Sequence, residues 1–369
     1  MTVFHRRPAL RWLVPAALAV VLAAGGSVAG VLSATADGPL APRSASQLLV
    51  DVQKAQVTGL SGTIVQNAEL GLPSLPGVGG GSSGSSEMSS LVSGSHTLRL
   101  WYAGPNRVRV ALLGSLGESD LVRNGTDLWT WSSKDKAATH REVPLSEQTP
   151  RSLASASPVT PQQAAEAALK AISPSTKVST DGTETVAGRP AYQLLLQPKD
   201  TASLVGSVRV AVDSKTRVPT RVQVFAKGQD EPAFEVGFTS FDPTTPSPTV
   251  FGFNPPPGTK VTESGTTAGS EGHSRDGARA RMHGSAADRP EVVGQGWTSV
   301  VVAKVPTRAT SSEGGSGQLA QALKVLPEVR GSWGSGHLLR GTLFSALLTD
   351  DGRLVVGAVA PEALYAALD

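Results

Sequence analysis

The chain contains no cysteine among its 369 residues. This absence excludes disulfides, thiolate metal sites, cysteine nucleophiles and attachment of a lipid to a cysteine. Aromatic residues make up only 5% of the chain, so we expect a core built mainly from Val, Leu and Ala.

Charge is also sparse, at 17% of residues with a net charge of +3 and no dense block of Lys or Arg. Nucleic-acid grooves combine clustered positive charge with interleaved aromatics, and this pattern is missing. None of the six histidines pairs with another at metal-ligand spacing on a helix. The sequence therefore predicts no nucleic-acid partner, no metal and no cofactor.

The N-terminal segment indicates export. Arg6, Arg7 and Arg11 precede an uncharged run that continues to Ala36. Ala34-Thr35-Ala36 has the small-x-small form of a signal-peptidase site, and the run is also long enough to span a bilayer. We expect residues 1–36 to be a signal peptide or an N-terminal membrane anchor, with the rest of the chain outside the cytoplasm.

Alternation of apolar and polar residues dominates the middle of the chain. In Ser207–Ala226, valines alternate with polar residues on both sides of a turn, which predicts an antiparallel hairpin with one apolar face. Similar segments predict roughly eleven strands. They are 59–66, 96–103, 107–113, 120–123, 127–131, 138–143, 177–186, 189–197, 207–212, 218–226 and 232–241.

Two helices are predicted beside these strands. Ser44 or Ser46 can cap the first, Ser46–Gln56, and Thr160 caps the second, Thr160–Ile172, with a proline at its first position. The polar, Gly-rich residues 264–290 predict a disordered linker. Residues 291–369 predict a small α+β module with a strand at 296–303, a helix at 318–326, a hairpin from 338–349 and 353–359, and a helix at 361–368.

Catalytic patterns are weak. Gly80-Gly81-Ser82-Ser83-Gly84 has nucleophile-elbow spacing, but it lies in a Gly/Ser tract without the strand and helix that the motif needs. Glu118 and Asp120 are a carboxylate pair of the kind used in glycoside hydrolysis, although charges beside strands usually protect sheet edges. We therefore predict that the chain is not an enzyme.

Two features allow both a structural and a functional interpretation. Trp129 and Trp131 share one strand face and either pack in the core or line a cavity for an acyl chain. The loop Leu70–Val78 either tucks under the sheet edge or forms a lid over an apolar mouth. Its lid candidates are Leu70, Leu72, Leu75 and Val78.

From Ser44 to Glu263 the sequence resembles the bacterial lipoprotein-carrier superfamily, the LolA-like group that includes LolB, LppX-like lipid binders and the sensor domain of RseB. The resemblance is carried by several segments in order. They are GLSGTI at 59–64, LWYAGPNRVR at 100–109, Asn124-Gly125 with LWTW at 128–131, VAVDSKTRVPTR at 210–221 and FGFNPPPG at 251–258. The composition and general character of the sequence suggest an actinobacterial member of this superfamily.

The resemblance implies an α+β fold in residues 44–263: an unclosed antiparallel half-barrel, with helices covering its concave face and a hydrophobic cavity for a lipid or acyl chain. It implies no catalytic residues. The predicted cavity lining is Leu98, Leu100, Tyr102, Val108, Val110, Leu112, Trp129, Trp131, Val208, Val210, Val212, Val222 and Val224.

Two functions follow. The first is an extracytoplasmic protein that carries or chaperones lipids or lipoproteins in the cell envelope. The alternative is an RseB-like envelope-stress sensor that acts through a membrane partner; the extra module at 291–369 and the N-terminal segment motivate it. In RseB, the C-terminal module takes part in contacting an anti-sigma factor, but residues 291–369 do not clearly match it.

Overall fold

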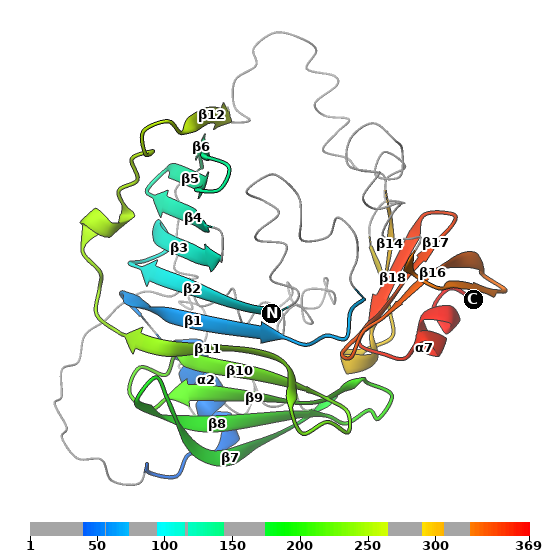
Figure 1. The fold of residues 1–369 in the computed structure, drawn as a ribbon. Helices are drawn as coiled ribbons and strands as arrows, with labels where there is room; N and C mark the ends of the chain where they lie inside the picture. The colour runs from blue at the N-terminus through cyan, green and yellow to red at the C-terminus, as the bar shows by residue number, and fades with distance from the viewer. Residues whose placement is uncertain are drawn as a thin grey trace, which may run out of the picture.

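The described residues up to 264 are organised around one open β-sheet, and a second, smaller sheet follows it (Figure 1). The computed structural model describes residues 40–55, 57–73, 94–114, 117–143, 174–264, 290–305 and 325–369. The predicted helix Thr160–Ile172 and most of the one at 318–326 lie outside these residues. No helix within the described ranges combines the length and apolar character needed to cross a membrane.

The large sheet has twelve strands. In chain order they are β1 Leu60–Ala68, β2 Gly94–Tyr102, β3 Arg107–Gly114, β4 Gly117–Asn124, β5 Asp127–Ser132, β6 Ala137–Glu142, β7 Thr176–Val186, β8 Arg189–Pro198, β9 Val205–Asp213, β10 Pro219–Ala226, β11 Pro232–Asp242 and β12 Lys260–Ser264. The spatial order is β12-β6-β5-β4-β3-β2-β1-β11-β10-β9-β8-β7. Its two edge strands, β12 and β7, do not pair, so the sheet is unclosed, as predicted.

The sequence predicted eleven of these strands and missed β12. Lys260–Ser264 carries a single aliphatic residue, Val261, and all five of its residues are exposed. It joins the sheet as a parallel neighbour of β6, whereas the other pairs in the sheet are antiparallel. Hydrophobic alternation does not reveal a strand that is attached by backbone pairing and polar side-chain contacts.

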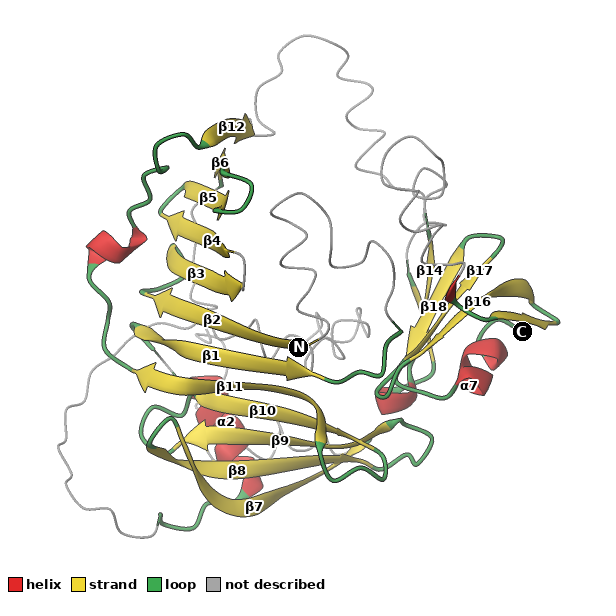
Figure 2. Ribbon diagram, in the orientation of Figure 1, coloured by secondary structure: helices red, strands yellow, loops and turns green. Residues whose placement is uncertain are grey.

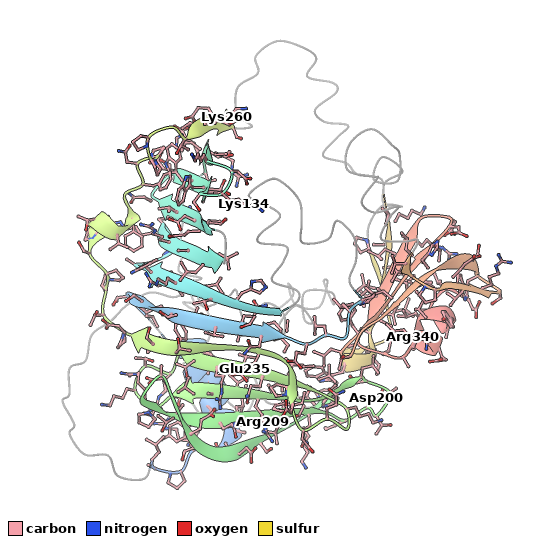
Figure 3. The ribbon with its side chains drawn as sticks, viewed as in Figure 1. Lys134, Asp200, Arg209, Glu235, Lys260 and Arg340 are labelled. Carbon is pink, nitrogen blue, oxygen red and sulfur yellow. The ribbon has the colours of Figure 1, made fainter. Side chains whose placement is uncertain are left out.

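The pairing register gives the large sheet two chemically different faces. Residues directly opposite each other on paired strands share a face. We call the face that carries Val210 face A, and the other face B. Across β8–β11, face A is aliphatic, whereas face B carries ion pairs and hydrogen bonds, as between Arg209 and Asp181 at 3.6 Å. Figure 3 labels Arg209 and Glu235 of this polar face; Glu235 accepts from Gln223 Nε2 at 2.7 Å.

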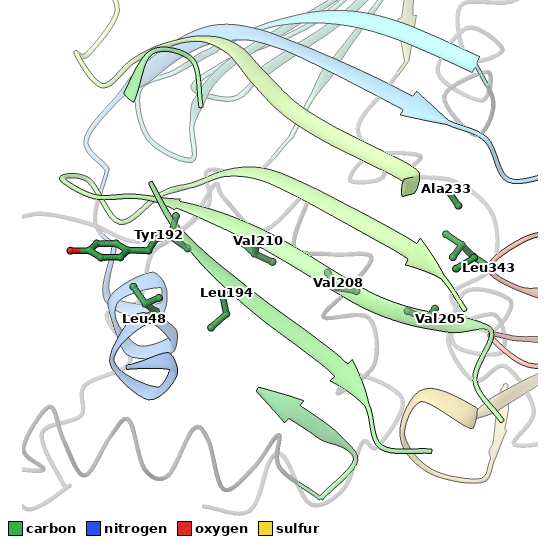
Figure 4. Packing of buried hydrophobic residues seen from close by; sticks show 10 residues of the cluster. Leu48, Tyr192, Leu194, Val205, Val208, Val210, Ala233 and Leu343 are labelled. Atoms are coloured by element: carbon green, nitrogen blue, oxygen red, sulfur yellow. The ribbon is translucent and has the colours of Figure 1, made fainter. Parts of the chain in front are cut away.

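Helix α2, Ala45–Lys54, packs on face A of the β7–β9 region. Ser44 caps it with a capping box to Gln47, which confirms one of the two predicted caps. Leu48 is fully buried in a cluster with side chains of β8 and β9 (Figure 4). Before the helix, the Ala41 carbonyl accepts a hydrogen bond from Tyr192 Oη at 2.9 Å.

The turn between β9 and β10 is organised by a buried carboxylate. Asp213 accepts hydrogen bonds from Arg189 Nε at 2.7 Å and Nη2 at 3.0 Å, and from the Thr216 backbone at 2.6 Å. Burial alone would raise the pKa of Asp213, but these bonds outweigh it and lower the pKa below the ordinary value of 3.8. The pair therefore fixes the hairpin that the alternating valines predicted.

The smaller sheet has six strands in the order β13-β14-β18-β17-β16-β15, and α7 packs against its β17 and β18. Its elements are β13 Glu291–Val293, β14 Val300–Lys304, β15 Glu328–Gly331, β16 Gly334–Arg340, β17 Ser345–Thr349, β18 Arg353–Gly357 and α7 Pro361–Ala366. The predicted hairpin around Asp350–Gly352 is present, but its first arm, 338–349, is two strands. The chain turns at 341–344, where Gly341 N donates to the Phe344 carbonyl.

The smaller sheet is attached directly to the large one (Figure 2). Ser203 forms an isolated bridge with Val359, and Trp297 Nε1 donates to Thr176 Oγ1 at 2.8 Å. Leu343, in the 341–344 turn, is 9% exposed and belongs to the same apolar cluster as Leu48. The module from 291 onwards therefore completes part of the large sheet's core.

Candidate functional site

The register separates the thirteen predicted lining residues into two groups. Eleven lie on face A, on strands β2, β3, β9 and β10. Trp129 and Trp131 lie on face B, because Trp129 is opposite Val122, which is opposite Arg109. Leu128, which precedes Trp129, and Thr130, which lies between the two tryptophans, face the same side as Val108 and Val110. The structure thus does not bring the tryptophans together with the other eleven.

The valines of β9 belong to the internal core. Val208, Val210 and Val212 are between 0% and 4% exposed. They pack with α2 and with Leu343 of the smaller module in one cluster, and Val222 and Val224 pack against it (Figure 4). Protein side chains therefore already cover this part of face A.

The aliphatic side chains of face A on β1–β5 have a different environment. Leu98, Val110, Leu121 and Leu128 are half-buried and belong to none of the four apolar clusters that the described residues form. Three rows cross these strands, about 7 Å apart along each strand. They are Ile64–Leu98–Leu112, Leu100–Val110–Leu121 and Tyr102–Val108–Arg123–Leu128. We call the nine residues of these rows other than Arg123 the aliphatic patch. Tyr102 and Leu112 are buried, and Ile64, Leu100 and Val108 pack against the cluster that contains Tyr102 and Phe238.

The prediction missed three members of the aliphatic patch, Ile64, Leu121 and Leu128. Each lies on a strand that the sequence did predict. Assigning them to the patch requires the register between neighbouring strands, which the Asn124–Asp127 pairing around the two-residue turn sets for β4 and β5. Counting outward from the pairing of Gly114 with Gly117 places Leu121 opposite Val110 and would have identified it.

The two tryptophans are covered by the connection between β11 and β12. Phe253 lies 5.3 Å from the ring of Trp129 and 6.2 Å from that of Trp131. The short helix η4, Pro248–Phe251, contacts β3 and β4, and Phe251 is 1% exposed. On face B the tryptophans therefore pack against this proline-rich connection.

His140 joins the edge strand β12 to the sheet, a role that the sequence did not predict. Its ring stacks on Trp129 at 4.3 Å, with Nδ1 2.7 Å from Glu263 Oε2 and Nε2 3.0 Å from Asp127 Oδ1. Partial burial lowers the pKa of His140, but the hydrogen bonds to Asp127 and Glu263 outweigh it and raise the pKa above 6.5. Protonated imidazole can donate to both carboxylates at once.

The carboxylate pair considered for hydrolysis also lies on face B. Asp120 is buried and forms an ion pair with Arg109 at 2.5 Å. Burial and the neighbouring Asp120 raise the pKa of Glu118 above its ordinary value of 4.5. Arg109 Nη1 also donates to the Val250 carbonyl, at 3.4 Å. Arg109, held by Asp120, therefore ties the β11–β12 connection to β3 on face B, away from the aliphatic patch.

The predicted lid segment is described only at its start. The Leu70 carbonyl accepts a hydrogen bond from Thr342 N at 2.7 Å, and Leu70 packs against the cluster around Leu343. Leu75, Val78 and the Gly80–Gly84 motif lie outside the described residues. The lid stays a prediction. Within the described ranges, no three His, Asp or Glu side chains come together as metal ligands.

No protein-family model and no curated protein matches the chain. Among solved structures it is similar to the Pseudomonas aeruginosa MucA/MucB complex, with 17% identity and a TM-score of 0.42 over 88% of this chain and 96% of that one. It is also similar to LprF from Mycobacterium bovis, with 11% identity and a TM-score of 0.28 over 57% of this chain and 99% of that one.

A LolA superfamily protein from Nitrosomonas europaea has 10% identity and a TM-score of 0.23, over 57% of this chain and 99% of that one. The structural neighbours thus include proteins of the superfamily that the sequence resembles. At TM-scores below 0.5 these likenesses carry no argument about function, and the actinobacterial source stays a prediction.

Proposed function

We propose that this chain is an extracytoplasmic binding protein that carries or chaperones lipids or lipoproteins in the cell envelope by burying acyl chains on the aliphatic patch. The observation that supports it is that Leu98, Val110, Leu121 and Leu128 are half-buried on face A and belong to none of the clusters that the described side chains form. Each methylene that leaves water contributes about 0.8 kcal/mol, so an acyl chain is the ligand class that gains most there. The proposal assigns the chain no catalysis.

Within this proposal, α2 and the smaller module are walls of the site. Both already pack on face A of the β8–β9 region, with Leu48 and Leu343 in one cluster. The ligand surface is therefore the β1–β5 part of face A, and the predicted lining on β9 and β10 belongs to the neighbouring core of the same face.

Location outside the cytoplasm is part of the proposal, and residues 1–36 support it through their sequence. Fusing these residues to a reporter that is active only after export would test it. Retention of the fusion in the cytoplasm would contradict this part without affecting the binding site.

The test of the binding site combines native mass spectrometry with binding of a fluorescent fatty acid. Leu121→Asn places an amide in the aliphatic patch, and we expect the affinity to fall about tenfold in a folded protein. Val261→Asn is the matched control, because Val261 is 44% exposed and lies on face B of β12. Absence of both co-purified lipid and fatty-acid binding in the unaltered protein would refute the proposal.

A sensor that acts through a membrane protein remains the second candidate, supported by the direct attachment of the 291–369 module to the large sheet. Cross-linking in membranes would test it. We expect a membrane protein to be recovered, in an amount that changes when Leu121→Asn removes lipid binding. Recovery of the same amount of membrane protein with the unaltered chain and with Leu121→Asn would rule out sensing through the aliphatic patch.

A further inference from the structure

Face A and face B of strands β1–β6 and β12 differ in charge. These strands carry five carboxylates, and the register places all five on face B: Glu118, Asp120, Asp127, Glu142 and Glu263. Face A of the same strands carries no carboxylate. It does carry three cations, Arg123, Arg141 and Lys260.

Two of the three cations border one end of the aliphatic patch. Arg123 is directly opposite Leu128, and Leu128 is directly opposite Arg141 on the next strand. The row Leu100–Val110–Leu121 lies one step further along the strands, about 7 Å away. Aliphatic side chains thus lead directly into a pair of arginines.

Local contacts hold Arg123 in place. Its Nη2 donates to Asn106 Oδ1 at 3.0 Å and its Nε donates to the Gly125 carbonyl at 3.3 Å, so it ties together the turns that follow β2 and β4. Arg141 is exposed. A guanidinium group can bind the two oxygens of a carboxylate or phosphate.

We propose that the ligand is an anionic amphiphile, with its acyl chain on the aliphatic patch and its negatively charged head group between Arg123 and Arg141. This inference rests on the proposed function and adds the chemistry of the head group. A carboxylate and a phosphate share the required charge and geometry. Lys260 lies at the far corner of face A, in the row of Leu112 and Ser119 (Figure 3).

The experiment uses the full chain with four probes: a pyrene-labelled hexadecanoic acid, its uncharged methyl ester, and pyrene-labelled phosphatidylglycerol and phosphatidylcholine. We expect the acid to bind at least fivefold more tightly than the ester at low salt, and the difference to shrink as salt is added. The two phospholipids tell whether a phosphate-linked head group serves as well as a carboxylate.

Arg141→Gln, Arg141→Glu and Arg123→Gln should each weaken binding of the acid about threefold or more and leave binding of the ester unchanged. Arg123→Lys retains the charge and separates loss of the turn contacts from loss of attraction. Arg107→Gln removes an exposed cation of β3 on face B. Lys260→Gln removes the distant cation on face A. Neither control should change either affinity.

Equal affinities for acid and ester, with no effect of the arginine variants, would overturn the anionic head group and leave the proposed function standing. A larger effect of Lys260→Gln than of Arg141→Glu would overturn the position of the head group. Failure of all four probes to bind would count against the proposed function itself.

Discussion

Two valines on face A should respond differently to the same substitution. Val210 is 3% exposed and packs in the cluster that contains Leu48 and Leu343. Val110 is half-buried in the aliphatic patch. Valine to threonine replaces a methyl group by a hydroxyl group of similar shape and keeps the β-branch that suits a strand. The comparison therefore isolates the cost of placing a hydroxyl at each position.

At Val210 the new hydroxyl faces Leu194 and Val222, which are directly opposite on β8 and β10 and offer no hydrogen bond through their side chains. Burying an unpaired hydroxyl costs about 1–3 kcal/mol in proteins. At Val110 water can reach the hydroxyl in the unliganded protein, so we expect a cost of about 0.5 kcal/mol or less. Val110→Thr should instead weaken binding of the fluorescent fatty acid.

Urea unfolding of the full chain, monitored by circular dichroism, measures the loss of stability as a shift of the unfolding midpoint at constant slope. Fluorescence titration of the two folded variants measures the loss of affinity for the fatty acid. If Val210→Thr kept the stability of the unaltered protein but lost the fatty acid, then β9 would line the ligand site and the division of face A would be wrong. A strong loss of stability in Val110→Thr would also contradict this division, because it would mean that Val110 lies in the core.

Three further predictions concern the framework. Breaking the buried pair by Asp213→Asn should reduce the free energy of unfolding by about 3–5 kcal/mol; because the pKa of Asp213 is lowered, its contribution is present above pH 3.8 and lost as pH falls through the folded value, which urea midpoints across acid pH will show. Because the pKa of His140 is raised, its contribution is complete below pH 6.5 and lost as pH rises through the folded value. The protection factors of β12 amides, which remove the intrinsic pH dependence of hydrogen exchange, should fall over that interval; constant protection factors, or the same profile in His140→Gln, would refute this. Leu343→Ala should cost about 2–4 kcal/mol in urea unfolding, whereas a change under 1 kcal/mol would mean that the module does not complete the core.

Much of the strand architecture could be predicted from alternation. The hairpins 96–113 and 207–226 were placed within about two residues of their observed ends, because a half-buried strand has to alternate. The capped helix α2 was predicted from Ser44 and its apolar stripe. Where alternation is absent, as in β12, the prediction failed, because backbone pairing with β6 and the contact between His140 and Glu263 hold the strand without burying an apolar face.

The division of face A could not be predicted, because it depends on contacts between distant segments. Val210 and Val110 look alike in the sequence, each a valine between arginine or alanine neighbours. Leu48 and Leu343, almost three hundred residues apart, come together over β8 and β9 and turn that region into core. Only tertiary packing separates a buried position from a half-buried one with the same pattern.

The missing cysteine and the sparse aromatics determined from the outset that this protein folds without disulfides and builds its core from aliphatic residues. The sequence also determined the run of strands, since the period of two is a local property of each segment. Which face Trp129 occupies, which part of face A stays half-buried, and the segregation of carboxylates to face B were decided by the tertiary structure. The physical reason is register: pairing that shifts by one residue exchanges the two faces of a strand, and only contacts between strands fix it.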